Sequence, residues 1–325
     1  MTEEPAPELD LVADFQPETE EFLAEVLRGF ASPPRMLPSK YLYDEQGSEL
    51  FERICELDEY YLTRTELSIL EQRRAEIAQV LGPQCLLIEF GSGSSRKTRV
   101  LLDALKDPAG YVPIDISREQ LTRSARALSR RYPTLEVLPV CADYTREYHV
   151  PEPAGPVRRR IAYFPGSTIG NFEPANAQTF LKHCAQICGP RGGVLIGVDL
   201  HKDTATLEAA YDDRQGVTAL FELNILARLN RELGASFDLD RFRYEARYNT
   251  QQRRVEMYLV SLDAQQVWLG NRCLELAKGE RILTEHSYKY TLEGFRDLAA
   301  TQDLAVKHVW TDPNALFSVQ FLTPE

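Results

Sequence analysis

Three features that each define a class of protein are missing from this 325-residue sequence. No stretch approaches the roughly 18 apolar residues of a membrane-spanning helix. The acidic, proline-rich start, Met1–Gln16, has neither the basic flank nor the apolar run of a secretory signal. Basic residues are outnumbered 37 to 49, and the net charge of −12 repels nucleic-acid phosphates. We therefore expect a cytoplasmic monomer that binds a small molecule, with no membrane or nucleic-acid partner.

Cysteine is sparse, with six residues and no CxxC pair. Most of them lie in apolar runs, which predicts free structural thiols rather than a disulfide scaffold. Cys184 and Cys188 have a spacing that could serve a metal on a helix, but no His or carboxylate pattern completes four ligands. We therefore predict no metal site. The 43% of apolar residues is enough for one large domain or two modest ones.

From Cys85 onward, short apolar runs alternate with helical patterns, which is typical of a parallel sheet wrapped by helices. Apolar residues at three-to-four spacing predict crossover helices over Arg118–Tyr132 and Ala175–Cys188. The sequence thus predicts a doubly wound, Rossmann-like α/β fold. Its strands are expected over Cys85–Phe90, Gly110–Asp115, Leu135–Cys141, Arg160–Phe164 and Gly193–Asp199.

The pattern changes after Asp199. Residues 203–233 have a nearly continuous helical pattern with a break around Asp213–Gly216. Phe242–Tyr248 and Arg254–Val260 then alternate like antiparallel strands. We infer an inserted α+β domain over about residues 201–289.

Two more strands near the end of the chain, Leu304–Trp310 and Ala315–Leu322, predict a hairpin that could finish the large sheet. The chain then divides into two discontinuous parts. We expect a cofactor-binding domain of residues 62–200 plus 290–325 and a substrate-binding domain of residues 10–61 plus 201–289.

The segment Glu89–Thr98 follows a predicted buried strand and opens a helix, so Gly91 and Gly93 permit a tight turn and close approach of a ligand. A dinucleotide fold prefers a third glycine three residues after Gly93, and a phosphate loop needs glycine directly before Lys97. Arg96 occupies that position and disfavours both. What remains is S-adenosylmethionine, whose methyltransferases resemble this sequence in their acidic-x-Gly-x-Gly turn.

Acidic residues follow the next two predicted strands. Asp115 lies 22 residues after Gly93, where a carboxylate could accept hydrogen bonds from two ribose hydroxyls. Asp143 follows the third strand, where such methyltransferases bind the adenine amino group, and Tyr144 stands beside it to contact the ring. The resemblance therefore implies a cofactor site made by these residues, the glycine turn and Lys97.

The fourth predicted strand ends in Phe164–Pro174, with the sequence FPGSTIGNFEP. Strand ends at this edge face the ligand, and the segment offers adaptable glycines and one amide side chain. It resembles the Gly-Thr-Ile-Gly-Asn loop of histidine-specific Nα-methyltransferases, which make trimethylhistidine betaine (hercynine) on the route to ergothioneine. Ser167 stands where we expect a second glycine or similar small residue, a departure that concerns local backbone shape only.

The resemblance covers roughly residues 35–322 and implies a class I methyltransferase that transfers three methyl groups from S-adenosylmethionine to the α-amino nitrogen of L-histidine. It rests on a series of segments rather than on one motif. Besides the loop, these are Lys40–Phe51, Glu59–Glu66, Ala210–Thr218, Asn224–Leu233, Arg254–Met257 and Thr284–Lys289.

Carried over residue by residue, the resemblance places Tyr43, Tyr60 and Tyr211 around the amino-acid head of the substrate. Asn171 then holds the α-amino group, and Gly166 belongs to the same loop. The chemistry fits, because phenol hydroxyls can donate to a carboxylate and aromatic faces attract a methylated ammonium.

The resemblance also implies that Glu285 and Ser287 grip the imidazole ring and that Met257 lines the ring pocket. Residues two apart in an extended segment face the same way, so Glu285 and Ser287 should point to one side and His286 to the other. A carboxylate and a hydroxyl can together read the two nitrogens of an imidazole.

Methyl transfer to an amine needs no metal and no covalent enzyme intermediate, but the amine must lose a proton first. We assign catalytic roles to Tyr43 and Asn171, and expect Tyr43 or a bound water to receive that proton. None of the five histidines lies in a catalytic pattern, which argues against a hydrolase triad. Two alternatives stay open: an N-methyltransferase of another aromatic amino acid or amine, and a non-catalytic module that senses the nucleotide.

Overall fold

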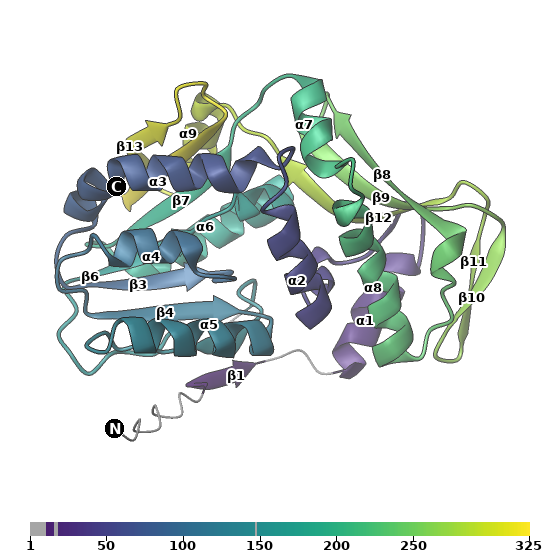
Figure 1. Cartoon of the computed structure of the whole chain (residues 1–325), viewed down its shortest axis with the longest axis horizontal. Coiled ribbons are helices and arrows are strands. Elements are labelled where there is room, and N and C mark those ends of the chain that lie inside the picture. The colour runs from purple at the N-terminus through teal and green to yellow at the C-terminus, as the bar shows by residue number, and fades with distance from the viewer. Residues whose placement is uncertain (1–10, 16–18, 147) are drawn as a thin grey trace.

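An eight-stranded sheet forms the centre of the larger lobe in the computed structural model, which describes residues 11–15, 19–146 and 148–325 (Figure 1). Most of the acidic segment Met1–Gln16 therefore lies outside the described residues. The strands lie in the order β1 (Ala13–Phe15), β5 (Val140–Ala142), β4 (Gly110–Asp115), β3 (Cys85–Phe90), β6 (Arg159–Phe164), β7 (Gly193–Asp199), β14 (Phe317–Pro324) and β13 (Leu304–Thr311).

The strand order reverses direction between β3 and β6. From β3 the chain adds β4 and β5 on one side, and then β6 and β7 on the other, all parallel. The hairpin β13–β14 completes the sheet, with β14 antiparallel to β7. This confirms the predicted doubly wound α/β sheet, and it places a ligand crevice at the carboxyl ends of β3 and β6.

Helices cover both faces of this sheet because successive side chains on each buried strand alternate between two cores. On β6, Ile161 and Tyr163 belong to one core and Ala162 and Phe164 to the other. The first core is covered by α3 (Tyr61–Leu81), α4 (Arg96–Leu102) and α5 (Arg118–Arg131), and the second by α6 (Pro174–Cys188) and α9 (Leu292–Ala300).

Two features of the larger lobe differ from the prediction. The strand expected over Leu135–Cys141 is confined to Val140–Ala142 plus a single bridge at Val137, because Pro139 has no N–H for a ladder. Strand β1 pairs in parallel with β5 and forms the edge of the large sheet, although the sequence-based division assigned residues 10–61 to the substrate domain.

The smaller lobe contains a four-stranded sheet in the order β2 (Arg35–Met36), β12 (Arg281–Tyr288), β9 (Arg254–Ser261) and β8 (Phe242–Asn249). Strand β2 brings the N-terminal segment into this lobe by pairing with β12. Figure 1 shows the hairpin β10–β11 at the far end of the lobe. The remaining elements are α1 (Thr19–Phe30), η1 (Ser39–Leu42), α2 (Glu45–Ile54), α7 (Thr204–Tyr211), α8 (Val217–Leu233), η3 (Leu239–Arg241), β10 (Gln265–Leu269) and β11 (Arg272–Leu276).

The predicted helix break lies between α7 and α8. Asp213 caps α8, because its two carboxylate oxygens accept the backbone N–H groups of Val217 and Thr218 at 3.0 and 2.8 Å. None of the helices in the described part of the chain is long and apolar enough to cross a membrane.

Candidate active site

A cavity of about 820 Å³ opens at the carboxyl ends of β3, β4 and β6 and is also lined by the smaller lobe. Every residue predicted to bind the cofactor lines it. These residues are Gly91, Gly93, Lys97, Asp115, Asp143 and Tyr144. Of the residues predicted to bind the substrate, those that line the same cavity are Tyr43, Tyr60, Gly166, Asn171 and Glu285.

The glycine turn after β3 leaves room for a ligand. Gly91 and Gly93 have φ of +70° and +45°, a region that favours glycine. A Cβ atom built on either residue would meet no atom within 4 Å, so the turn faces open space. The backbone N–H of Gly93 donates to Asp115 Oδ2 at 3.1 Å, which ties the ends of β3 and β4 together.

Two of the predicted cofactor residues, Asp115 and Asp143, have carboxylate side chains. Asp115 also accepts the backbone N–H of Ser117 at 2.9 Å, and burial raises its pKa above the ordinary value. The carboxylate of Asp143 accepts from Lys40 Nζ at 2.8 Å, a contact that joins the two lobes. Burial alone would raise the pKa of Asp143, but hydrogen bonds from Lys40 and Thr145 outweigh it and hold that pKa below its usual range.

Glu89 is a third acid at this end of the cavity. Its Oε2 atom accepts from the hydroxyls of Thr98 and Tyr111, each at 2.5 Å. The side chain is buried, and burial raises its pKa to about 8 in spite of these hydrogen bonds. Glu89 therefore loses its proton most readily when a cation lies beside it.

The buried carboxylate of Glu66 connects a predicted cofactor residue to a predicted substrate residue. Glu66 on α3 is fully buried, and its Oε2 lies 2.5 Å from Lys97 Nζ. The same oxygen accepts the backbone N–H of Gly166 at 2.8 Å. Lys97 follows the glycine turn and Gly166 belongs to the loop after β6, so Glu66 fixes the two loops relative to each other.

The loop after β6 continues into η2 (Thr168–Asn171). Ser167, where a glycine was expected, has φ of +59°, and its hydroxyl accepts the backbone N–H of Asp199 at 2.9 Å. A Cβ on Gly170 would lie 2.8 Å from the carbonyl oxygen of Tyr288, so only glycine lets the loop pack this closely on β12.

This close packing brings together two predicted substrate residues from different lobes. Asn171 Nδ2 donates to Glu285 Oε1 at 2.9 Å. Burial raises the pKa of Glu285 well above its ordinary value; the nearby carboxylate of Glu222 adds to this shift, and the ammonium of Lys289 opposes it. The site can therefore present an amide and a carboxyl group of variable charge to one small molecule.

Aromatic rings line the wall next to this pair. The ring of Tyr43 makes edge contacts with Phe51 and Phe221 at centroid distances of 5.5 and 5.3 Å. Tyr60 makes similar contacts with Phe51 at 6.2 Å and with Tyr211 at 5.9 Å. Burial raises the pKa of Tyr43 well above its ordinary range, so its phenol stays protonated at neutral pH.

Three predicted substrate residues lie behind the cavity wall. Ser287 accepts hydrogen bonds from the Tyr211 hydroxyl at 2.9 Å and from Lys289 Nζ at 2.8 Å. Met257 is buried on β9 and pairs with Glu285 across the β9–β12 ladder. His286, expected to point away from Glu285, also lines the cavity, and its Nδ1 lies 3.9 Å from Glu173.

Sequence reasoning overlooked several of these groups, and for one of them a signal exists. Glu66 interrupts the apolar stripe that Leu62, Ile69 and Leu70 form on α3, and a carboxylate on a buried face needs a partner. Lys40 begins one of the segments on which the family resemblance rests, and Glu222 lies between two others. The sequence around them gives no comparable indication of a role in the cavity. Among the described residues, no group of three or more His, Cys, Asp or Glu side chains could hold a metal ion.

Comparison with known proteins places this cavity in context. A family profile described as "Histidine-specific methyltransferase, SAM-dependent" matches residues 22–324. The chain is 42% identical to the histidine N-alpha-methyltransferase of Mycolicibacterium smegmatis, over 91% of this chain and 92% of that protein. It is also 42% identical to the histidine N-alpha-methyltransferase of Mycobacterium tuberculosis, over 89% and 90% respectively.

A longer relative matches over most of this chain. Ergothioneine biosynthesis protein 1 of Neurospora crassa is 36% identical over 86% of this chain, which corresponds to 32% of that protein. The family profile and the two bacterial relatives together cover the glycine turn, the loop after β6 and the inserted strands. The chain therefore belongs to the family of S-adenosylmethionine-dependent, histidine-specific methyltransferases.

Proposed function

We propose that this enzyme transfers three methyl groups, one at a time, to the α-amino nitrogen of L-histidine and so forms hercynine, a step of ergothioneine biosynthesis. The observation that carries the proposal is the contact between Asn171 and Glu285 at 2.9 Å. It joins an amide suited to an amino group and a carboxyl suited to an imidazole N–H in the cavity that also contains the cofactor residues.

The residues at the carboxyl ends of β3 and β4 fit S-adenosylmethionine. The open turn at Gly91 and Gly93 admits the cofactor close to the backbone, and Asp115 has lone pairs left for two ribose hydroxyls. In this proposal Asp143 and Tyr144, which line the same cavity, contact the adenine, and Lys97 lies between the cofactor and the substrate. When bound, S-adenosylmethionine supplies a methyl group activated by a positively charged sulfur.

For the substrate, we propose that Tyr43, Tyr60 and Asn171 hold the amino-acid head and that Glu285 accepts the N–H of the imidazole. The loop at Gly166 sets the distance between the head and the cofactor. Holding two reactants in attack geometry can supply about 7–11 kcal/mol of the barrier at the upper end. In this proposal positioning, rather than an acid–base group, accounts for most of the rate.

The amine must be neutral before each transfer, and the residues around it favour the loss of a proton. The rings of Tyr43 and Phe51, which line the cavity, leave the amine only partly solvated and so disfavour an unpaired ammonium. Because the Tyr43 phenol already holds its proton firmly, we assign the proton to water rather than to this residue. Tyr43 then orients that water and contacts the growing cationic head through its ring.

Mass spectrometry of the reaction with S-adenosylmethionine and L-histidine tests the proposal. We expect products heavier by one, two and three methyl groups, with the trimethylated form as the end point. Parallel reactions with tryptophan, tyrosine and histamine test the alternative acceptors. Equal methylation of all four compounds would remove the imidazole assignment, and no methylation beyond controls would favour a non-catalytic sensor.

We further propose that the enzyme works as a cytoplasmic monomer without a membrane or nucleic-acid partner. The net charge of −12 supports the last point, because it opposes binding to phosphate backbones. Light scattering at assay concentration would test the oligomeric state, and a mass of twice 37.0 kDa would contradict the monomer.

A further inference from the structure

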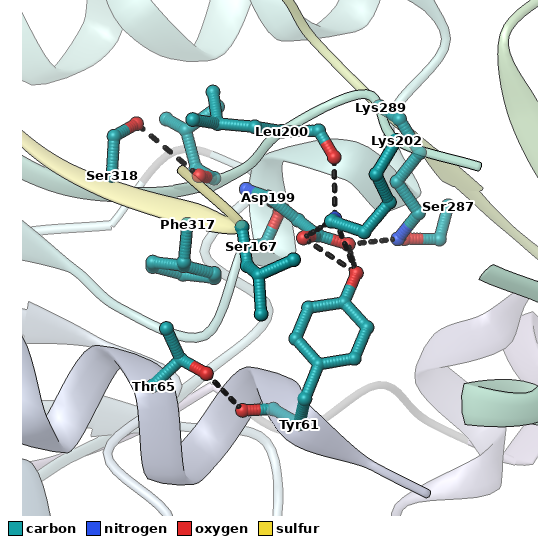
Figure 2. A network of polar contacts seen from close by, with 12 residues as sticks. Tyr61, Thr65, Ser167, Asp199, Leu200, Lys202, Ser287, Lys289, Phe317 and Ser318 are labelled. Atoms are coloured by element: carbon teal, nitrogen blue, oxygen red, sulfur yellow. Dashed lines mark hydrogen bonds and ion pairs between the residues drawn. The ribbon is translucent and has the colours of Figure 1, made fainter. Parts of the chain in front are cut away.

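A buried cluster of polar side chains surrounds Asp199, the last residue of β7 (Figure 2). Asp199 is fully buried, and both of its carboxylate oxygens accept from the Tyr61 hydroxyl at 2.8 Å. Two ammonium groups also contact it, Lys202 Nζ at 2.7 Å and Lys289 Nζ at 2.7 Å. One cation already balances one carboxylate, so the second is not needed for charge neutrality.

The second cation is costly to keep. Lys289 is almost completely buried, and burial lowers its pKa even though Asp199 lies beside it. A buried ion pair is in general no more stabilising than apolar residues of the same volume. The two ammonium groups differ in the other groups that they contact.

Lys289 connects three elements through its three N–H donors. Besides Asp199 on β7, it donates to the Tyr211 hydroxyl on α7 at 2.7 Å and to Ser287 Oγ on β12 at 2.8 Å. An ammonium has no further donor and no lone pair, so its hydrogen-bonding capacity is used up. Lys202, in contrast, contacts Asp199, Tyr61 and a backbone carbonyl.

The hydroxyls of Tyr211 and Ser287 also contact each other. The oxygens of Tyr211 and Ser287 lie 2.9 Å apart, so one hydroxyl donates to the other. Because both oxygens also accept from Lys289, the remaining O–H must point out of the triangle. Among the described residues no acceptor is recorded for it. The ammonium of Lys289 and the bond between the two hydroxyls thus fix the positions of both oxygens.

The cluster touches the substrate half of the active site. The Tyr211 ring packs edge-on against Tyr60, and a Cβ on Gly170, next to Asn171, would lie 3.2 Å from Ser287 Oγ. Ser287 also lies two residues from Glu285 on β12. The positive charge of Lys289 counteracts the effect of Glu222 on Glu285 and so favours the carboxylate form of that side chain.

We propose that Lys289, anchored on Asp199, is a positioning residue for the amino-acid substrate. It fixes the hydroxyl oxygens of Tyr211 and Ser287, and through them supports Tyr60 and the loop at Gly170, which lie next to the proposed site of the amino-acid head. This role rests on the proposed function, since it assumes that Tyr60 and Asn171 hold the head of bound histidine. The polar contacts of Lys289 in the described part of the chain include none of the predicted cofactor residues, so its effect should fall on histidine alone.

The variant Lys289→Met tests the proposal, with Lys202→Met as its matched control. Both remove an ammonium from Asp199 and keep the length of the side chain, but only the first removes contacts to Tyr211 and Ser287. We expect Lys289→Met to raise the KM for histidine about tenfold or more. Its kcat at saturating histidine should fall less than its KM rises, and its Kd for S-adenosylhomocysteine should stay within about twofold. Lys202→Met should leave all three constants within about twofold.

Equal effects of the two substitutions on the KM for histidine would overturn the positioning role and leave Lys289 as a structural charge. A parallel loss of S-adenosylhomocysteine affinity would do the same. If Lys289→Met shows no cooperative thermal transition, Lys289→Gln, whose two N–H donors cannot satisfy Asp199, Tyr211 and Ser287 together, is measured in the same way. A folded variant with wild-type KM again overturns the proposal. Failure of the wild-type enzyme to methylate histidine would instead contradict the proposed function.

Discussion

Single carboxylates decide the properties of both halves of the active site. Asp115 accepts backbone N–H groups from the glycine turn and from Ser117 and has lone pairs left for a ligand. Asp115→Asn exchanges one accepting oxygen for a donor, so we expect the Kd for S-adenosylhomocysteine to rise about 10- to 150-fold, corresponding to about 1.5–3 kcal/mol. Isothermal titration measures this change. Asp103→Asn, at an exposed carboxylate bound to Arg131, serves as a control and should leave the Kd unchanged.

The role of Glu285 is tested in the same way at the substrate end. Glu285→Ala should raise the KM for histidine about 10- to 150-fold, because it removes a charged hydrogen-bond acceptor. The affinity for S-adenosylhomocysteine should not change. Steady-state kinetics with histidine as the varied substrate decides the question, and unchanged histidine kinetics would show that the substrate pocket lies elsewhere.

Glu222 predicts a pH dependence of stability. It is fully buried, and burial raises its pKa to about 7 in spite of a hydrogen bond from Thr284. A folded-state pKa above the unfolded value near 4.5 means that stability is present at low pH and lost as the pH rises through about 7. Glu222→Gln removes this titration. We expect the melting temperature of the variant, relative to wild type, to be higher at pH 8 than at pH 5.

Thermal unfolding at several pH values between 5 and 8 provides the test of this prediction. The control is Glu275→Gln on β11, which is exposed and should show no pH-dependent difference from wild type. A difference between Glu222→Gln and wild type that is constant across the range would contradict the assignment of a near-neutral pKa to Glu222.

At the scale of elements, the contact between η2 and β12 brings Asn171 and Glu285 together in the proposed substrate site. Gly170→Ala places a Cβ 2.8 Å from the Tyr288 carbonyl, so the loop or the strand must move by several tenths of an ångström. Asn171 and Glu285 would then separate, and we expect the kcat/KM for histidine to fall at least tenfold. Gly155→Ala is the matched control, because its Cβ would meet no atom within 4 Å. Equal kinetics of the two variants would contradict the prediction.

The elements that the sequence predicted best are those whose burial is complete. Strands β3, β4 and β7 are mostly apolar and are buried on both faces, and their predicted limits agree with the structure. Strands β1 and β2 have three and two residues, too few for any periodicity, and their pairing with β5 and β12 depends on contacts distant in sequence. Short strands of this kind are defined by tertiary structure rather than by local pattern.

For the site, the residues carried on loops after strands could be placed from the sequence, because parallel strands bring their carboxyl ends to one edge. This is why Asp115, Asp143 and Asn171 line one cavity. The groups behind the wall could not be placed in this way. The contacts of Glu66 with Lys97 and of Lys289 with Tyr211 join segments that no local pattern relates.

At the scale of the whole molecule, both lobes contribute to the cavity, so a ligand should stabilise them together. A ligand that binds only the folded state at 100 times its Kd adds about 2.7 kcal/mol to the free energy of unfolding. We expect S-adenosylhomocysteine to raise the melting temperature by a few degrees in a single transition, and histidine to raise it further. Asp115→Asn at the same ligand concentration should show little of the first shift. Differential scanning calorimetry would reveal two separate transitions if the lobes unfolded independently.

The pairing of β2 with β12 also has a consequence for protein synthesis. Arg35 and Met36 emerge early from the ribosome, but their partners Ile282 and Leu283 are made almost 250 residues later. During most of translation this early segment has no strand to join, whereas β3 and β4 can pair as soon as both have emerged. The nascent chain can therefore assemble much of its larger lobe first. It completes the sheet of the smaller lobe only when synthesis is nearly finished.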